Sequence, residues 1–119
     1  EHRHTLVALN NYASSLKDLK RFEEAKSLLR EVLPVARRVL GEPNILTLEM
    51  PLHYARALYE NAYATLDDLR EAVTTLEEIE RTARRVLGAA HPLAAGIEKS
   101  LRNARAALRA RETPPTRSS

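Results

Sequence analysis

The residues of this chain that could carry chemistry are few, and their spacing assembles neither a catalytic site nor a metal site. Four histidines occur, at positions 2, 4, 53 and 91, and there is no cysteine. His2 and His4 are two residues apart, so on a helix they would point in different directions. His53 stands alone, and no histidine–carboxylate cluster has zinc-ligand spacing. With no thiolate, glycine-rich phosphate loop or nucleophile turn, we expect no enzyme activity, no metal and no cofactor.

A second candidate feature is the positive charge of the C-terminal end. Residues 1–80 carry 10 Lys or Arg against 14 Asp or Glu, whereas residues 81–119 carry 9 against 2. Such an end can steer an acidic partner towards itself or favour end-to-end contacts. Nucleic acid is disfavoured as a ligand, because no aromatic residue lies among these charges to stack on bases. The simpler interpretation is a solvated terminal helix whose charges prevent further stacking.

The composition limits the fold to helices packed on helices. The 119 residues include one Phe, no Trp and three Gly, so the core must be filled with Leu, Ala and Val. No stretch is apolar over the ~20 residues needed to cross a bilayer, and the first residues do not resemble a signal peptide. We therefore expect an all-α, cytoplasmic domain. Because the chain opens inside a repeat and without Met, we also expect it to be a fragment of a longer protein.

The hexapeptide Ala-Arg-Arg-Val-Leu-Gly occurs twice, at residues 36–41 and 83–88, which indicates a duplicated unit. Apolar residues at helical spacing predict five helices. Their approximate bounds are residues 5–19, 22–40, 47–60, 66–87 and 91–112. Gly41 suits a helix C-terminus because glycine readily takes positive φ. Thr65 with Asp68 approximates a capping box at the start of the fourth helix.

Single residues predict further details of these helices. Pro34 should bend the second helix, and Pro51 should make the third helix start late or kink. The offset between the two units grows from 42 to 47 residues, so five extra residues around 61–64 should lengthen a turn or a helix. The residues expected to face the core are Leu6, Leu9, Tyr12, Ala13, Leu16, Phe22, Ala25, Leu29, Val32, Ala36, Val39, Leu48, Tyr54, Ala55, Leu58, Ala72, Leu76, Ile79, Ala83 and Val86.

Several short motifs carry a resemblance to a known family. They read Thr-Leu at 5–6, Leu-Asn-Asn-Tyr-Ala at 9–13, Phe-Glu-Glu-Ala at 22–25, Val-Leu-Gly at 39–41 and Leu-Gly-Ala-Ala-His-Pro at 87–92. This order resembles the long tetratricopeptide repeat of kinesin light chains over about residues 4 to 108. In the second unit the Asn pair is replaced by Leu52 and His53, a departure from the pattern.

The resemblance implies an α-solenoid of antiparallel helical hairpins within a repeat domain at residues 1–112. The hairpins would cover about residues 4–41 and 47–88, followed by a capping helix at about 91–112 and a disordered tail at 113–119. The first helix of each hairpin would line a concave groove. In the resembled family the Asn of this motif commonly holds the backbone of an extended peptide, since an amide both donates and accepts hydrogen bonds.

Applied to this chain, the resemblance implies that the helix face containing Asn11 binds a peptide. The candidate partner-binding residues are Asn11, Ser14, His53, Arg56 and Tyr59. For each of them the alternative interpretation is an ordinary solvated helix face.

Two hypotheses for function follow. The first is a non-enzymatic scaffold for protein–protein interaction, which binds a peptide or partner protein, acidic if the basic end takes part, on the concave face. The second is an oligomerisation module that self-associates through the uncapped N-terminal repeat. The fifth helix should close the other end, because Glu98, Arg102, Arg105 and Arg109 occupy the face where another helix would pack, and burying four charges is costly. We expect no membrane partner.

Overall fold

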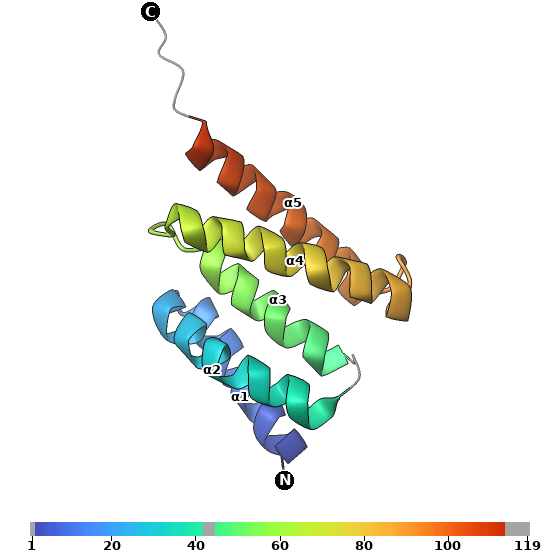
Figure 1. Ribbon diagram of the computed structural model, residues 1–119. Coiled ribbons are helices and arrows are strands. Elements are labelled where there is room, and N and C mark those ends of the chain that lie inside the picture. Colours follow the sequence, from blue (N-terminus) through green and yellow to red (C-terminus); the bar gives the residue numbers. More distant parts are fainter. Residues whose placement is uncertain (1, 42–44, 114–119) are drawn as a thin grey trace, which may run out of the picture.

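The computed structural model describes residues 2–41 and 45–113, and these residues form five α-helices and no strand. The helices are α1 (His2–Asp18), α2 (Phe22–Leu40), α3 (Ile45–Tyr59), α4 (Leu66–Leu87) and α5 (Pro92–Glu112). They stack in chain order, from α1 and α2 at one end to α5 at the other (Figure 1). The all-α helical-repeat architecture predicted from the sequence is confirmed. The predicted loop at 42–44 and the tail from 114 lie outside the described residues.

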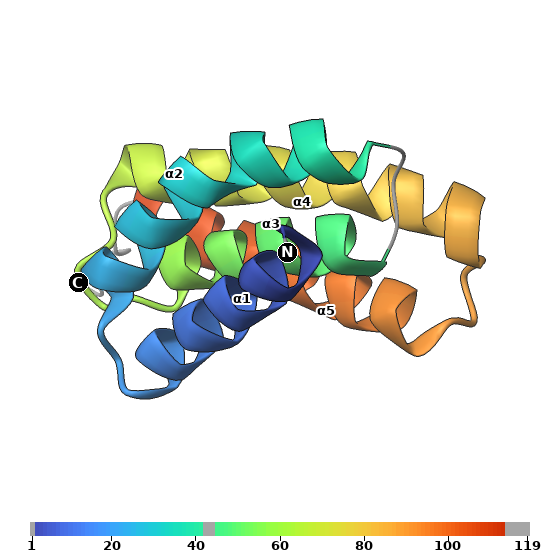
Figure 2. The ribbon, with the colours of Figure 1, turned by 90° about the horizontal axis from the view of Figure 1, so that it is seen from below.

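The helices are arranged in two layers (Figure 2). One layer contains α1, α3 and α5, and its outer surface is called the odd-helix face below. The other layer contains α2 and α4, and its outer surface is called the even-helix face. Within the odd layer, α3 contacts both α1 and α5, whereas no Cα atom of α2 comes within 8 Å of one in α4. The even layer is therefore the more open of the two.

The helix α3 is the buried centre of the stack. Nine of its fifteen residues are buried, because it is covered by the hairpin before it and by α4 and α5 after it. Ala55 of α3 and Ala72 of α4 are fully buried in the main core, and small side chains allow two helices to approach to about 8–10 Å. A smaller cluster of Leu16, Ala25 and Ala57 fills the other end of the first hairpin.

Helix ends lie where residues with local capping chemistry occur. Gly41 and Gly88 follow α2 and α4 with φ of 72° and 87°, and their N–H groups bond to carbonyls one turn earlier. Thr65 and Asp68 form the predicted capping box: Thr65 Oγ1 accepts from the Asp68 N–H at 3.0 Å, and Asp68 Oδ2 accepts from the Thr65 N–H at 3.2 Å. At α5, Nδ1 of His91 accepts from the Leu93 N–H at 3.0 Å. The extra residues before Thr65 lengthen the turn between α3 and α4.

The expectation that Pro51 makes the third helix start late is wrong. The helix begins at Ile45, and Pro51 is its seventh residue, with its ring buried. Proline removes one helical hydrogen bond, and we attribute the tolerance at this position to the dense packing around α3. A kink at Pro51 and a bend at Pro34 stay predictions.

Three residues expected in the core are exposed. Val39 and Val86 lie in the last turns of α2 and α4, beyond the last buried residues of those helices, Ala36 and Ala83. Tyr12 is 54% exposed because no hairpin of the described chain covers the outer side of α1. The buried side chains of α5, among them Ile97, Leu101 and Ala104, join the main core. Arg102, Arg105 and Arg109 of the same helix are exposed.

Candidate functional site

The odd-helix face carries a row of polar side chains that joins α1 to α3. Asn10 is buried, and its Oδ1 lies 2.9 Å from Nδ1 of His53. A proton on Nδ1 makes the ring the donor and the amide oxygen the acceptor. Burial lowers the pKa of His53 below the ordinary 6.5, and the positive charges of Arg56 and Lys17 lower it further, while Asp18 opposes them. At neutral pH this imidazole is therefore neutral and half-buried.

A charged network continues the row towards the ends of α1 and α3. Lys17 is 8% exposed, and its Nζ lies 3.2 Å from Asp18 and 3.6 Å from Glu60. Glu60 also accepts a hydrogen bond at 2.8 Å from Nε of Arg56. Burial works against the charge on Arg56, but the hydrogen bond and charge of Glu60 outweigh it, so the pKa of Arg56 is raised. These contacts hold Arg56 in one orientation beside α5.

A cavity of about 260 Å³ opens between α3 and α5 on this face. Arg56, Tyr59 and Glu60 line it from the α3 side. The residues that line it from α5 are Gly96, Lys99, Ser100 and Asn103. Ser100 is buried, whereas Lys99 and Asn103 are exposed at the mouth. The cavity therefore gathers donors of several kinds, with one carboxylate as an acceptor.

The structure brings together only some of the residues predicted to bind a partner. Arg56 and Tyr59 meet in the cavity. His53 lies on the same face but is engaged by Asn10. Asn11 is exposed on α1, and Ser14 is half-buried there; neither lines the cavity.

The sequence interpretation missed the contribution of α5. The repeat register contained the signal, because the 47-residue offset that carries Gly41 to Gly88 also carries His53 to Ser100 and Arg56 to Asn103. The fifth helix was instead interpreted only as a cap. In the structure α5 presents polar residues on the same face as α3.

Three arginines at the C-terminal end are paired with carboxylates. Arg84 lies 2.9 Å from Glu80, Arg102 lies 3.1 Å from Glu98 and Arg105 lies 3.0 Å from Glu77. Paired guanidinium groups have less charge to offer phosphate, since a phosphate would have to compete with a carboxylate. The pairing therefore weakens the case for a nucleic-acid site around Arg84, Arg102 and Arg105.

Across residues 2–41 and 45–113, no group of three His, Cys, Asp or Glu side chains is placed to hold a metal ion. Within the same residues, none of the helices combines the length and apolar character that crossing a bilayer requires.

Residues 5–45 match the family model of the tetratricopeptide repeat. The match covers α2 and most of α1, and it supports a relationship of this segment to a tetratricopeptide repeat family. No curated protein and no solved structure gives a significant match. Tetratricopeptide repeats generally mediate protein–protein interaction and are generally non-enzymatic.

Proposed function

We propose that this chain is a non-enzymatic protein-recognition module of the kinesin light chain-like type, which binds a peptide segment of a partner on its odd-helix face. The cavity between α3 and α5 carries the proposal. There Arg56, Lys99 and Asn103 line one cavity. In the described part of the chain, Lys99 has no ion-pair partner, so its charge is available to a ligand.

The cavity has the chemistry that a peptide needs. Peptide carbonyls and carboxylates accept hydrogen bonds, and Arg56, Lys99 and Asn103 supply donors. Glu60 can accept from a peptide N–H. The wall is open at Gly96, since a Cβ built there would meet no atom within 4 Å. Because cations outnumber the carboxylate, an acidic segment is the best complement.

The surface for a longer peptide would continue from this cavity across α3 to α1. His53 lies next along the face, and Asn11 and Ser14 are the corresponding positions of the first unit. The amide of Asn11 has no partner within residues 2–41 and 45–113. It can therefore hold a peptide backbone without breaking an existing contact.

A peptide array, followed by titration of the best ligand, tests the proposal. Lys99→Glu should weaken binding on the order of tenfold, because it replaces an attraction at the cavity with a repulsion. Arg109→Glu is the matched control, since it makes the same charge change on an exposed position of α5 away from the cavity. Equal losses in the two variants would show that only the overall charge matters and would remove this site.

Self-association through the N-terminal unit is a second candidate function, favoured by one observation. Tyr54 is 4% exposed, whereas Tyr12, its counterpart 42 residues earlier, is 54% exposed. The neighbouring counterparts behave alike: Met50 is buried, and Ala8 is exposed. The outer side of α1 is therefore a repeat-stacking surface that a second copy could cover.

Sedimentation across a dilution series tests self-association. If a second copy covers the outer side of α1, the chain dimerises, and Tyr12→Asp makes it monomeric. Tyr63→Asp is the control, since Tyr63 is 90% exposed but lies in the turn before α4. A chain that is monomeric at every concentration excludes this candidate and leaves peptide recognition untouched.

A further inference from the structure

The two most exposed large apolar side chains lie where two turns of the chain meet. Tyr63 is 90% exposed and Leu19 is 67% exposed, more than any other large hydrophobic side chain within residues 2–41 and 45–113. Leu19 lies in the turn between α1 and α2, and Tyr63 lies in the turn between α3 and α4. Both turns are at the same end of the helices, on the left in Figure 2. This surface, residues 19–24 and 61–63, is called the turn edge below.

The turn edge contains a cavity of about 280 Å³. Residues 20–24 line one side of it, and Asn61 and Tyr63 line the other. A hydrogen bond of 3.4 Å from Nδ2 of Asn61 to Glu23 joins the two sides. The half-buried Phe22 also lines the cavity and packs on the smaller core cluster of the first hairpin. None of these residues lines the cavity between α3 and α5, so the two sites are separate.

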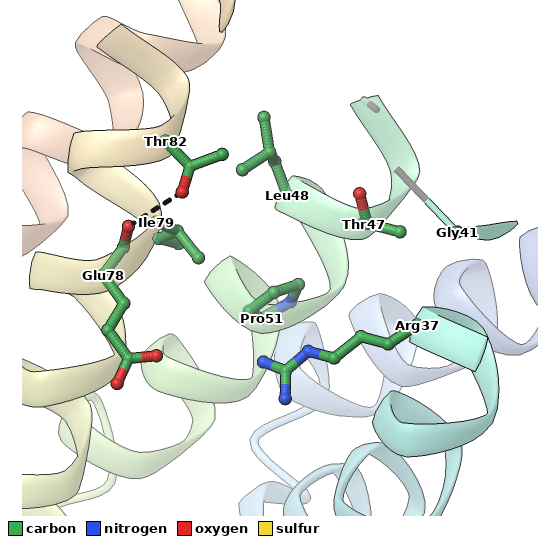
Figure 3. A pocket seen from close by; sticks show the side chains of 8 residues that line it. All are labelled: Arg37, Gly41, Thr47, Leu48, Pro51, Glu78, Ile79 and Thr82. Atoms are coloured by element: carbon green, nitrogen blue, oxygen red, sulfur yellow. Dashed lines mark hydrogen bonds between the residues drawn. The ribbon is translucent and has the colours of Figure 1, made fainter. Parts of the chain in front are cut away.

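The apolar lining of the larger cavity, between α2 and α4, is buried. This cavity measures about 360 Å³, and its apolar lining residues include Leu48, Pro51 and Ile79 (Figure 3). All three belong to the buried interior, so a partner would cover little apolar area on them. Removal of exposed apolar surface from water is the main favourable contribution to most protein association. The turn edge is therefore the better docking surface of the two.

Hydrogen bonds fix the backbone that carries Tyr63. The Tyr63 N–H donates to Oδ1 of Asn61 at 2.9 Å, and the Ala64 N–H donates to the Asn61 carbonyl at 3.0 Å. Ala64 is buried, and its carbonyl accepts from Nη1 of Arg111. A side chain on a fixed backbone loses less conformational entropy when it binds, and tyrosine is among the residues that contribute most at interfaces. The exposed ring of Tyr63 is thus well placed to anchor a partner.

Lys20 adopts a backbone conformation that glycine favours. Its φ is 63°, and in the described part of the chain no other non-glycine residue has a positive φ. The Lys20 N–H donates to the Lys17 carbonyl and the Arg21 N–H donates to the Leu16 carbonyl, both at 2.8 Å. These bonds form a Schellman motif, in which glycine is the usual residue at this position. Lysine here costs stability, and what it adds in place of glycine is an exposed ammonium group beside the cavity.

The ammonium of Lys20 is the charge that remains available in this cavity. Arg21 lies 2.6 Å from Glu24, and Glu23 lies 3.0 Å from Lys26, whereas Lys20 has no ion-pair partner among the described residues. A single free cation beside an exposed apolar surface complements a carboxylate next to an apolar group. Phosphate chains are disfavoured, because Glu23 and Glu24 line the same cavity.

We propose that the turn edge binds a loop of a partner protein in which an apolar side chain stands next to an Asp or Glu. The apolar side chain lies in the cavity against Tyr63 and Phe22, and the carboxylate pairs with Lys20. The extra residues of the second unit lengthen the turn that carries Tyr63, so they help to create this surface. The proposal does not depend on the peptide site of the odd-helix face.

Three capped dipeptides test the proposal on the whole chain. They are acetyl-Leu-Asp-amide, acetyl-Leu-Asn-amide, which keeps the shape without the charge, and acetyl-Ala-Asp-amide, which lacks most of the apolar group. For the first we expect saturable NMR amide shifts at Lys20, Asn61 and Tyr63, with a Kd on the order of 1 mM, weaker than the limit for so small a ligand. The Leu-Asn probe should bind about two- to fivefold more weakly, and the Ala-Asp probe about tenfold more weakly. Equal affinities of the three probes, or no saturable shift at the turn edge, overturn the proposal.

Two variants with matched controls locate the binding. Tyr63→Ser should weaken the Leu-Asp probe about tenfold, whereas Tyr12→Ser, the same change at another exposed tyrosine, should leave it unchanged. Lys20→Gly should weaken it about two- to fivefold without lowering the melting temperature, because relief of the strained φ offsets the greater freedom of the unfolded chain. Lys99→Gln removes a charge from the cavity between α3 and α5 and should leave the probe unaffected.

The outcomes separate this site from the other surfaces of the chain. Equal affinity in Tyr63→Ser and Tyr12→Ser refutes the turn edge as the binding site. Self-association of the chain that is lost in Tyr63→Asp would assign the turn edge to a second copy and would overturn the partner loop. Dipeptide binding that survives Lys99→Gln supports a separate site, and it does so whether or not a peptide binds on the odd-helix face.

Discussion

Replacing Tyr54 with Phe tests whether one hydroxyl that joins three helices stabilises the stack. Tyr54 Oη accepts from Nε and Nη2 of Arg30 at 3.1 and 2.7 Å and donates to Oε2 of Glu71 at 2.5 Å. The Arg30 guanidinium also lies 5.7 Å from the centroid of the ring. The substitution removes three hydrogen bonds to charged groups but keeps the buried ring and the Arg30–Glu71 ion pair.

The exposure of the two charged partners sets the magnitude. A hydrogen bond to a charged group contributes about 1.5–3 kcal/mol, so three such bonds suggest a large loss. However, the side chains of Arg30 and Glu71 are 56% and 43% exposed, and water can replace the hydroxyl for both. We therefore expect Tyr54→Phe to lower the free energy of unfolding by about 1–2 kcal/mol.

Urea unfolding followed by circular dichroism measures this loss. Tyr12→Phe is the matched control, because Tyr12 holds the same repeat position in α1 with its side chain largely in solvent. We expect the control to change the free energy of unfolding by less than about 0.5 kcal/mol. Equal losses in the two variants would refute the reasoning, because the effect would then not depend on the contacts with Arg30 and Glu71.

Four further predictions concern titration, capping and binding. Burial, with the hydrogen bond to Glu71, raises the pKa of Tyr54 from 10.0 to about 12. The contribution of the protonated hydroxyl to the free energy of unfolding should therefore be lost as pH rises between these values. Phenolate absorbance should report this ionisation. The pKa of His53 is lowered, so the contribution of its neutral form to the free energy of unfolding is present above pH 6.5 and is lost as pH falls through the folded pKa. His53→Gln should flatten this part of the stability–pH curve. An NMR titration of His53 should give a midpoint below 6.5. Thr65→Ala should cost about 1 kcal/mol in urea unfolding by removing the capping box, and no loss would contradict the role of the cap. Asn11→Ala should weaken a ligand of the odd-helix face while leaving helicity and melting nearly unchanged, and equal affinity would refute its role.

The sequence predicts the helices best where their ends carry local chemistry. Glycine at positions 41 and 88 and the Thr65 cap act within one turn of chain, and α2 and α4 have the predicted bounds. The start of α3 has no such signal within the described residues, and Pro51 predicted that this helix starts later. The packing of α3 between its neighbours determines where this helix begins, and packing is not a local property of the sequence.

Burial at equivalent repeat positions shows the limit of pattern arguments. Tyr12 and Tyr54 precede an alanine in the same register, and both were expected in the core. Tyr54 is buried because the preceding hairpin covers it, and Tyr12 is exposed because no hairpin within residues 2–41 and 45–113 covers it. The candidate site behaves likewise: Arg56 and Tyr59 were predicted, but Ser100 and Asn103 complete the cavity only through the register of α5 against α3.

The charge pairs between α2 and α4 depend still more on tertiary structure. The sequence places Glu71 and Glu78 at the same separation, 41 residues, from Arg30 and Arg37. Sequence separation therefore predicts the same fate for both pairs. In the structure the first pair forms an ion pair beside Tyr54, whereas the second pair forms none within the described residues. The difference comes from the helices around each pair, so only the assembled stack distinguishes charges that form an ion pair from charges that do not.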